Sequence, residues 1–536
     1  MALCAAVVAF FISACRTHTN HPVSEMVRVE SGMLHGVVSN GVVSFLGVPY
    51  AAPPMGPLRW APPQRTESWR GVRDATKPAL AAAQGDGKSP KDNTNEDCLC
   101  LNITAPLPVA KAQPKPVMVW LHGGGFSGGK GSSYDPRRMV TEGDVIVVTV
   151  EFRLNIFGCF GYPGLKDSGT FILLDQQAAL AWVQRNIAAF GGDPKNVTLF
   201  GESGGAIAAC AQLTSPSAKG LFHKAILQSG AATTSWPRNT PNLGNQTSFW
   251  RPLKEVETAG ENLAVQMGCP ERKGSPEALQ WLRDQPAAKL LAHSHEFATA
   301  AYGGRVLPRH PAMALKEGRF RAMPVLSGYT RDEGRALALG MQLMAGGKAM
   351  TEDESRNLLR NSFGERMTEV EAHYPRDRYA SPTLAWAAIY TDRMFAGPQF
   401  TATRAVATQS AAFMYEFADT NSPGLLPFFP GFPPGASHSG ELPFLFDIEK
   451  FPIDMTGKHV ALTAAQRALG TTMIRYWTQF AHSGDPNSQG TPYWPRFAAD
   501  EGVQRVQILA PGLKGVEPTS DAAVAHQCEF WERFTE

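Results

Sequence analysis

A serine flanked by glycines is the clearest candidate nucleophile in this chain. Ser203 lies in the run NVTLFGESGGAIAACAQL, between Gly201 and Gly205, where a strand-like segment gives way to a helix-like one. In the pattern GxSxG, a tight strand-to-helix turn needs small residues two positions before and after the serine, and it holds the hydroxyl out at the end of a sheet. The motif predicts nucleophilic attack by Ser203. Taken alone, five residues of such common types also fit an ordinary turn.

A second glycine-rich stretch could supply the hydrogen-bond donors that acyl transfer requires. The run KPVMVWLHGGGFSGG reads as a buried apolar strand that ends at His122 and continues into Gly123, Gly124 and Gly125. Consecutive glycines let backbone N–H groups approach a substrate and stabilise the developing oxyanion. Because hydrolases with a nucleophile elbow carry an HGGG loop upstream of it, the two motifs together predict an oxyanion hole.

A histidine must act as the base that activates the serine, and the chain has thirteen. Two of them share the string HSG. His438 lies in LLPFFPGFPPGASHSGELPF, whose prolines and glycines exclude a regular helix and predict a rigid loop over a site. His482 follows the apolar periodic run TTMIRYWTQFA and is therefore expected in the last turn of a helix, where the dipole favours a histidine without any catalytic role. We expect His438 to be the base.

The acid that orients the base is expected between the nucleophile and the base, because α/β-hydrolases order their triad as Ser, Asp or Glu, and His. The run MPVLSGYTRDEG fits this position. Residues 323–327 read as a short buried strand, and Asp332 and Glu333 follow it in a polar loop. The residues alone do not choose between these neighbours. Glu441, three residues after His438, is a third candidate whose position favours a role in bracing the loop.

Together these motifs resemble the type B carboxylesterases, the cholinesterase-related branch of the α/β-hydrolases. The resemblance covers nearly everything after residue 25, through SFLGVPYAAPPMGPLRWAPPQ, NEDCLCLNI, HGGGF, LLDQQAALAWVQRNIAAFGGDPKNVTLFGESGG, KAILQSG, SGYTRDEG and ASHSGELPFLF. It implies an α/β-hydrolase fold, with a large, mostly parallel central sheet flanked by helices and a helical covering region around an active-site gorge. With the N-terminal features described below, it indicates a bacterial member of the family.

The resemblance also implies a role for each matching residue. It makes Ser203 the nucleophile, Glu333 the acid and His438 the base of a Ser-His-Glu triad. It assigns the oxyanion hole to the backbone N–H groups of Gly124, Gly125 and Gly204. Glu202 and Ser229 correspond to supporting residues that help to order the histidine and the acid. The implied reaction is hydrolysis of a carboxylic ester through an acyl-enzyme, with no metal or other cofactor.

Two places depart from the family pattern. Gly204 stands where the family usually has alanine, and the freer backbone of glycine holds an oxyanion donor less firmly. We expect Gly204→Ala to preserve activity or to change the rate modestly. Glu151 and Phe152 stand where the family has Asn and Tyr, and we expect Glu151 to pair with Arg153 or another cation, because acids are rarely buried unpaired.

Cysteine usage separates the chain from secreted eukaryotic members of the family. The disulfide that closes a loop before the EDCL motif in those members has no second cysteine here for Cys98, and Cys269 is single as well. Cys98 and Cys100 lie two positions apart in a strand-like run, farther than a disulfide normally spans. We expect free cysteines, buried at Cys159 and Cys210.

The N-terminus bears on the compartment. Residues 1–14 are apolar but too few to span a bilayer, and the string ISAC that ends at Cys15 resembles a bacterial lipobox. On this interpretation residues 1–14 are a signal peptide, Cys15 is lipidated, and residues 15–24 tether a periplasmic or extracellular domain to a membrane. The positively charged start of a signal is missing, so an ordinary secretory signal or an incorrectly assigned start codon stays open.

The elements that position these residues read as one α/β domain over residues 25–536. No linker or internal repeat divides the 536-residue chain. An apolar stripe predicts a helix over 172–190, which GGDP ends before the nucleophile strand, and helix-like stretches over 250–400 predict the covering layer. A net charge of +2 with mixed signs gives no reason to expect nucleic-acid binding, and 43% hydrophobic residues suffice for a core.

The substrate is expected to be a small-molecule ester whose identity the motifs leave open. Carbamate, amide or thioester hydrolysis could use the same groups, and a non-catalytic adhesion protein of the same fold is the alternative from another class. Residues 80–97 contain no Trp, Tyr or Phe, so they offer no aromatic face for a choline group. The segment LLPFFPGFPPG before His438 either lines an apolar acyl or alcohol pocket or packs as an ordinary rigid loop.

Overall fold

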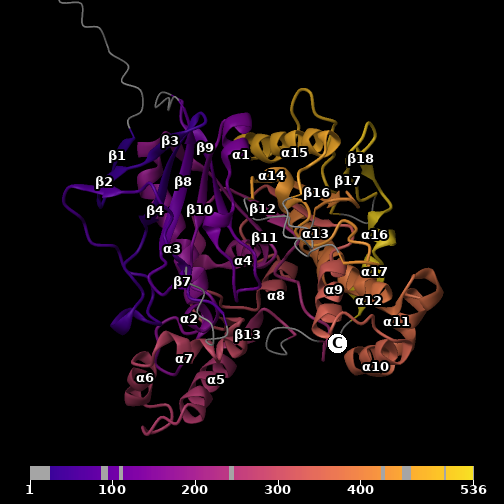
Figure 1. The fold of residues 1–536 in the computed structure, drawn as a ribbon, viewed down its shortest axis with the longest axis horizontal. Coiled ribbons are helices and arrows are strands. Elements are labelled where there is room, and N and C mark those ends of the chain that lie inside the picture. Colours follow the sequence, from indigo (N-terminus) through magenta and orange to yellow (C-terminus); the bar gives the residue numbers. More distant parts are fainter. Residues whose placement is uncertain are drawn as a thin grey trace, which may run out of the picture.

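An eleven-stranded sheet with helices on both faces forms the centre of the computed structural model (Figure 1). The structure describes residues 25–85, 94–107, 113–240, 247–423, 429–448, 460–499 and 503–534, so the predicted signal, tether and lipidation site lie outside the described residues. From edge to edge the strands are β18 (Val516–Thr519), β17 (Val506–Leu509), β16 (Ala412–Phe417), β15 (Val325–Thr330), β12 (Lys224–Gln228), β11 (Gly192–Glu202), β9 (Lys115–Leu121), β10 (Ile146–Val150), β8 (Cys100–Pro106), β4 (Val42–Pro49) and β3 (Val37–Ser39).

The middle of this sheet is parallel, as the sequence predicts. Strands β10, β9, β11, β12, β15, β16 and β17 all run in one direction. Antiparallel pairs occur only towards the two edges, at β10–β8–β4–β3 and at β17–β18. Because the carboxyl ends of parallel strands meet at one edge of a sheet, the loops that follow β9, β11 and β15 are brought together there.

The two faces of the sheet carry separate cores, which explains the nearly continuous apolar runs of its strands. Along β9, Val117, Val119 and Leu121 pack into one core, and Met118 and Trp120 pack into the other. This alternation follows from the two-residue period of a strand, and strands covered on both faces are apolar on both. The first core includes residues of α3 (Phe171–Asn186), α4 (Gly204–Thr214) and α13 (Gly397–Ala407); the second includes residues of α1 (Arg137–Gly143), α14 (Leu442–Leu445) and α15 (Ala464–Ser483).

The helix-rich region predicted over residues 250–400 is confirmed. In Figure 1, α5, α6 and α7 gather at one end of the molecule, and α9 to α12 gather beside the C-terminal helices α16 and α17. The bounds of these and the remaining helices are α2 (Asn155–Cys159), α5 (Leu253–Gln266), α6 (Pro276–Arg283), α7 (Ala287–Leu291), α8 (Pro311–Lys316), α9 (Gly334–Met344), α10 (Glu352–Phe363), α11 (Met367–His373), α12 (Pro382–Tyr390), α16 (Ala522–Ala525) and α17 (Cys528–Arg533). Small sheets join β1 (Met26–Val29), β2 (Gly32–His35) and β5 (Val72–Asp74), β6 (Ala81–Ala82) and β7 (Thr94–Asn95), and β13 (Trp250–Pro252) and β14 (Ala300–Tyr302).

Three further predictions are confirmed locally. The stripe over 172–190 forms α3 followed by a 3₁₀ turn over Ile187–Phe190. His482 lies in the last turn of α15, which a left-handed Gly484 ends. All six cysteines that the structure describes are free, and Cys159 and Cys210 are buried. Within the described residues, no helix is both long and apolar enough to cross a membrane.

Candidate active site

Ser203 lies at the sharp turn between β11 and α4. Its backbone has φ 53° and ψ −122°, a strained conformation for a residue with a side chain, and its N–H donates to the carbonyl of Gln228 at 2.9 Å. A Cβ on Gly201 would lie 2.6 Å from the carbonyl carbon of Gly205, and a Cβ on Gly205 would clash with the carbonyl oxygen of Leu121, so close packing requires both flanking glycines. The Ser203 side chain is partly exposed. This is the geometry of a nucleophile elbow.

The glycine loop after β9 lies against this turn. A Cβ on Gly123 would sit 3.2 Å from the Cβ of Ser203. Gly124 and Gly125 have φ of +108° and +59°, which favour glycine, and in the described structure neither donates its N–H to a protein acceptor. The N–H of Gly204 begins α4 and also has no partner within the helix. These three donors are therefore available to a ligand atom near Ser203.

Glu333 and His438 are brought together from separate parts of the chain. Glu333 ends the turn after β15 and is fully buried, and its Oε2 lies 2.5 Å from Nδ1 of His438. The other carboxylate oxygen accepts the N–H of Thr330 at 2.9 Å, which fixes the orientation of the acid. The ring of Phe395 packs on the imidazole with centroids 4.8 Å apart. The contact with Glu333 leaves Nε2 of His438 as the nitrogen that faces away from the acid.

Asp332, the neighbour that the sequence left open as an acid, has different partners. Its backbone N–H donates to the carbonyl of Ala436 at 2.9 Å, and its Oδ2 accepts the N–H of Ala436 at 2.9 Å. Arg335 lies 2.8 Å from its other oxygen. Asp332 therefore ties the loop that carries His438 to the turn that carries Glu333, and it does not contact the imidazole through any recorded bond.

Glu202 also faces His438, and it has a partner that the sequence analysis missed. Its Oε1 lies 3.3 Å from Nε2 of His438 and accepts the hydroxyl of Ser439 at 2.5 Å. Burial raises the pKa of Glu202, and the charge of His438 opposes that rise. Burial would lower the pKa of His438, but Glu333, Glu202 and Glu441 raise it to about 9. Only the position of Ser439 next to His438 hinted at its involvement.

Glu441 and Ser229 are both fully buried. One oxygen of Glu441 accepts the amide of Gln228 at 3.0 Å and the other has no partner among the described residues; burial and the nearby Glu202 and Glu333 raise its pKa to about 8. Ser229 follows Gln228 with φ 53°, and its buried hydroxyl also has no described partner.

The structure shows no hydrogen bond between the hydroxyl of Ser203 and His438. Such bonds are often long in the absence of substrate.

The sequence model of the carboxylesterase family matches residues 23–531 of the chain. The chain belongs to the carboxylesterase family. This carboxylesterase is 33% identical to a pyrethroid hydrolase of Rattus norvegicus over 96% of the chain and 89% of the relative. It is 32% identical to a cocaine esterase of Homo sapiens and to an acylcarnitine hydrolase of Mus musculus, each over 96% of the chain and 90% of the relative.

Family membership makes this carboxylesterase a carboxylic ester hydrolase with the α/β-hydrolase fold. The three relatives are mammalian and give no support to a bacterial source.

The loop that leads to His438 is described from Phe429. Phe432 of this loop is buried against Ala338, Leu339 and Ala387, which favours packing over a pocket-lining role for this part of the segment.

The expected tolerance of alanine at Gly204 is not supported by the geometry of the carboxylesterase. A Cβ at Gly204 would lie 2.9 Å from the backbone nitrogen of Gly125, 3.2 Å from its Cα and 3.3 Å from the nitrogen of Phe126. All three atoms belong to the glycine loop after β9, which carries the N–H groups of Gly124 and Gly125. The missing Cβ lets this loop approach the elbow closely, so alanine would displace the donors themselves.

The expected pairing of Glu151 with Arg153 is wrong. Arg153 is bound through Nε and Nη2 to the buried Asp175 at 2.8 and 2.7 Å. Glu151 instead accepts the N–H of Ser132 at 2.9 Å, at the start of a 3₁₀ turn, and its other oxygen has no described partner. Burial raises the pKa of Glu151 to about 6. The backbone N–H groups of Ser132 and Gly131 oppose this rise most strongly, and the charge of Lys130, a cation other than Arg153, opposes it further.

Proposed function

We propose that this carboxylesterase hydrolyses carboxylic esters with Ser203 as nucleophile, His438 as base and Glu333 as acid. The observation that carries the proposal is the 2.5 Å contact between His438 and Glu333 at the same end of the sheet as the strained Ser203 turn. Three partnerless backbone donors beside Ser203 add support. A purely adhesive role would need none of these groups in this arrangement.

The chemistry follows from the positions of these groups. Nε2 of His438 takes the hydroxyl proton of Ser203 as its oxygen attacks the ester carbonyl, while Nδ1–H stays bonded to Glu333. The N–H groups of Gly124, Gly125 and Gly204 stabilise the tetrahedral oxyanion. The imidazolium then gives its proton to the departing alcohol, which leaves an acyl-enzyme, and water repeats the attack. A single oxyanion donor contributes about 3 kcal/mol in a comparable site.

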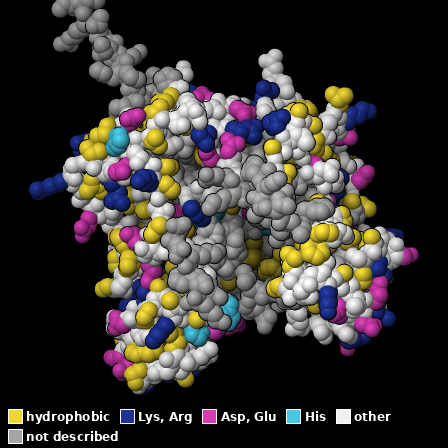
Figure 2. All heavy atoms as spheres, viewed as in Figure 1, with side chains coloured by type: hydrophobic (Ala, Val, Ile, Leu, Met, Phe, Trp, Pro, Cys, Tyr) yellow, Lys and Arg dark blue, Asp and Glu magenta, His cyan; other side chains and the backbone are white. Residues whose placement is uncertain are grey.

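We further propose that the substrates are esters with large apolar parts. The relatives bear the names pyrethroid hydrolase, cocaine esterase and acylcarnitine hydrolase, which suggests esters with large apolar parts. On the face shown in Figure 2, hydrophobic side chains gather over the region of α9 and α12, where Leu343 and Met344 are exposed. Carbamates, amides and thioesters remain alternatives for the same groups, and relative rates on matched substrates separate them.

We also propose that the carboxylesterase is exported and anchored through Cys15. The support is the lipobox-like string ISAC after a short apolar stretch. The mass of the mature N-terminal peptide tests this: a lipidated Cys15 supports the anchor, and an unmodified N-terminus elsewhere supports an ordinary secretory signal.

The assignment of the acid is tested by comparing Glu333→Gln with Asp332→Asn in hydrolysis of p-nitrophenyl butyrate. We expect Glu333→Gln to lower kcat by about 10³- to 10⁴-fold, because the imidazole loses the carboxylate that orients it and stabilises its charge. Asp332→Asn keeps an oxygen for the N–H of Ala436 and should retain most activity. His482→Gln, on the exposed end of α15, is the matched histidine control. The reverse order of the two acids would contradict the assignment.

A further inference from the structure

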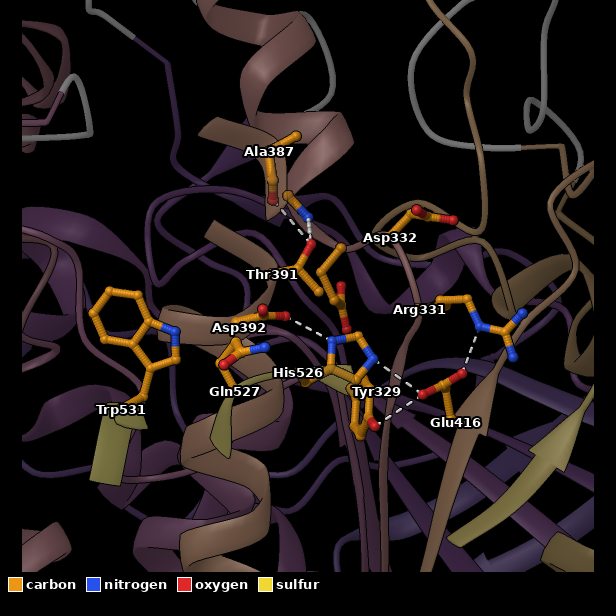
Figure 3. A network of polar contacts seen from close by, with 12 residues as sticks. Tyr329, Arg331, Asp332, Ala387, Thr391, Asp392, Glu416, His526, Gln527 and Trp531 are labelled. Carbon is orange, nitrogen blue, oxygen red and sulfur yellow. Dashed lines mark hydrogen bonds and ion pairs between the residues drawn. The ribbon is translucent and has the colours of Figure 1, made fainter. Parts of the chain in front are cut away.

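We propose that His526, near the C-terminus, is a positioning residue for the triad acid, because it joins the two elements that hold either side of the turn carrying Glu333. The inference rests on the proposed function. No part of the mechanism above uses His526, yet its side chain is buried between two carboxylates (Figure 3).

One element holds the turn in front of Glu333. Arg331, two residues before the acid, donates from its backbone to the carbonyl of Phe417 at 2.8 Å and from Nε to Oε1 of Glu416 at 2.6 Å. Glu416 and Phe417 lie at the end of β16. These two bonds hold the first residue of the turn against the neighbouring strand.

A second element holds the turn behind Glu333. The N–H of Gly334 donates to the hydroxyl of Thr391 at 2.9 Å, and this hydroxyl donates to the carbonyl of Ala387 at 3.0 Å. Thr391 begins a π-helical turn, Thr391–Ala396, between α12 and α13. Such turns are rare and occur often at functional sites. The next residue of that turn is Asp392.

His526 connects strand β16 to the π-helical turn. Nδ1 lies 2.6 Å from Oδ1 of Asp392, and Nε2 lies 3.0 Å from Oε2 of Glu416. The hydroxyl of Tyr329, on β15, donates to the same oxygen of Glu416 at 3.0 Å, and its ring meets the imidazole edge to face. Figure 3 shows His526 lying between the two carboxylates. A shift of either element therefore changes the bonds of the other.

The charges around His526 make this connection strong. Burial alone would lower the pKa of His526, but Asp392 and Glu416 raise it to about 10. The pKa of Glu416 falls to about 2, because His526 and Arg331 outweigh the effect of burial. Other titratable groups that interact with these carboxylates are Tyr329, Tyr374, Tyr379 and Cys528. The hydroxyl of Tyr374 donates to Asp392 at 2.7 Å. A neutral residue at 526 would leave two buried carboxylates without their shared cation.

The test compares wild type with His526→Gln, measuring kcat, KM and the pH dependence of kcat/KM with p-nitrophenyl butyrate. A displaced Glu333 binds His438 less well, so we expect kcat to fall on the order of 10- to 100-fold with little change in KM. The pKa of His438 should fall with it, which moves the acid limb of the profile to lower pH. Loss of a distant cation by charge alone would move that limb to higher pH.

The matched control is His373→Gln. His373 lines the same cavity of about 370 Å³ as His526, but its Nδ1 contacts Gln527 and no carboxylate. We expect it to behave as wild type. If His526→Gln does not fold, Arg331→Gln tests whether Glu416 positions the turn. The side chain of Arg331 is 43% exposed, and its loss removes the ion pair between Glu416 and the turn.

An acid limb that stays in place or moves to higher pH in the folded variant would overturn the role of His526, even if kcat falls. A lower limb with reduced kcat supports it. A wild type that neither hydrolyses the ester nor reacts with an organophosphate at Ser203 would instead refute the proposed function, and this inference with it.

Discussion

His438 faces more negative charge than a single triad acid supplies. Glu333 binds Nδ1, Glu202 lies 3.3 Å from Nε2, and Glu441 lies behind both. Burial and the nearby Glu202 and Glu333 raise the pKa of Glu441, whereas Glu333 and Glu202 contact the imidazole directly. Both carboxylates favour the imidazolium, which forms when Ser203 gives up its proton. The same charge keeps the resting histidine protonated to higher pH.

This charge predicts the pH dependence of the enzyme. The carboxylates raise the pKa of His438 to about 9, so the acid limb of kcat/KM should lie above 6.5, the ordinary value for histidine. Glu202→Gln removes one negative charge, lowers the pKa of His438 and makes the neutral base available at lower pH. We expect its acid limb to move down. Glu142→Gln, on the outer helix α1, should leave the limb in place, and an unmoved limb in Glu202→Gln would contradict the role of Glu202.

At the scale of elements, the site is a set of loops held against one another at the carboxyl ends of the strands. The elbow supports the oxyanion loop through the close contact at Gly204, and Asp332 ties the acid turn to the base loop at Ala436. The buried Glu151 holds the segment that follows the oxyanion loop by accepting the N–H of Ser132. Rigid supports of this kind let an active site keep its donors in place without reorganisation.

Gly204→Ala tests the contact between the elbow and the oxyanion loop. Because the new methyl group would lie 2.9 Å from the nitrogen of Gly125, the loop must move by a few tenths of an ångström, and we expect kcat to fall about tenfold or more while KM changes little. Gly340→Ala is the matched control, since a Cβ there meets nothing within 4 Å and alanine favours the helix α9. Equal kcat values in wild type and Gly204→Ala would show that the loop yields freely.

At the scale of the whole molecule, the features that could be predicted are those that local sequence decides. Helix α3 and the position of His482 follow from periodicity and from turn residues nearby, and the family resemblance predicts the mostly parallel sheet. The partners of Asp332 and His526 could not be predicted, because they lie 104 and 110 residues away in the chain, at Ala436 and Glu416. Contacts at such separations leave no periodic signal. The same limit explains why residue patterns alone left Asp332 and Glu333 open, since His438 lies 105 residues from Glu333.

The central claim, that Ser203 forms a covalent acyl-enzyme, is tested most directly by reaction with an organophosphate followed by mass spectrometry of the peptides. We expect one phosphoryl group per chain, attached to Ser203, and loss of ester hydrolysis in proportion to labelling. Ser203→Ala should take up no label and hydrolyse no ester, while Ser439→Ala should still be labelled at Ser203. Undiminished hydrolysis in Ser203→Ala, or stoichiometric labelling at another residue, would contradict the account.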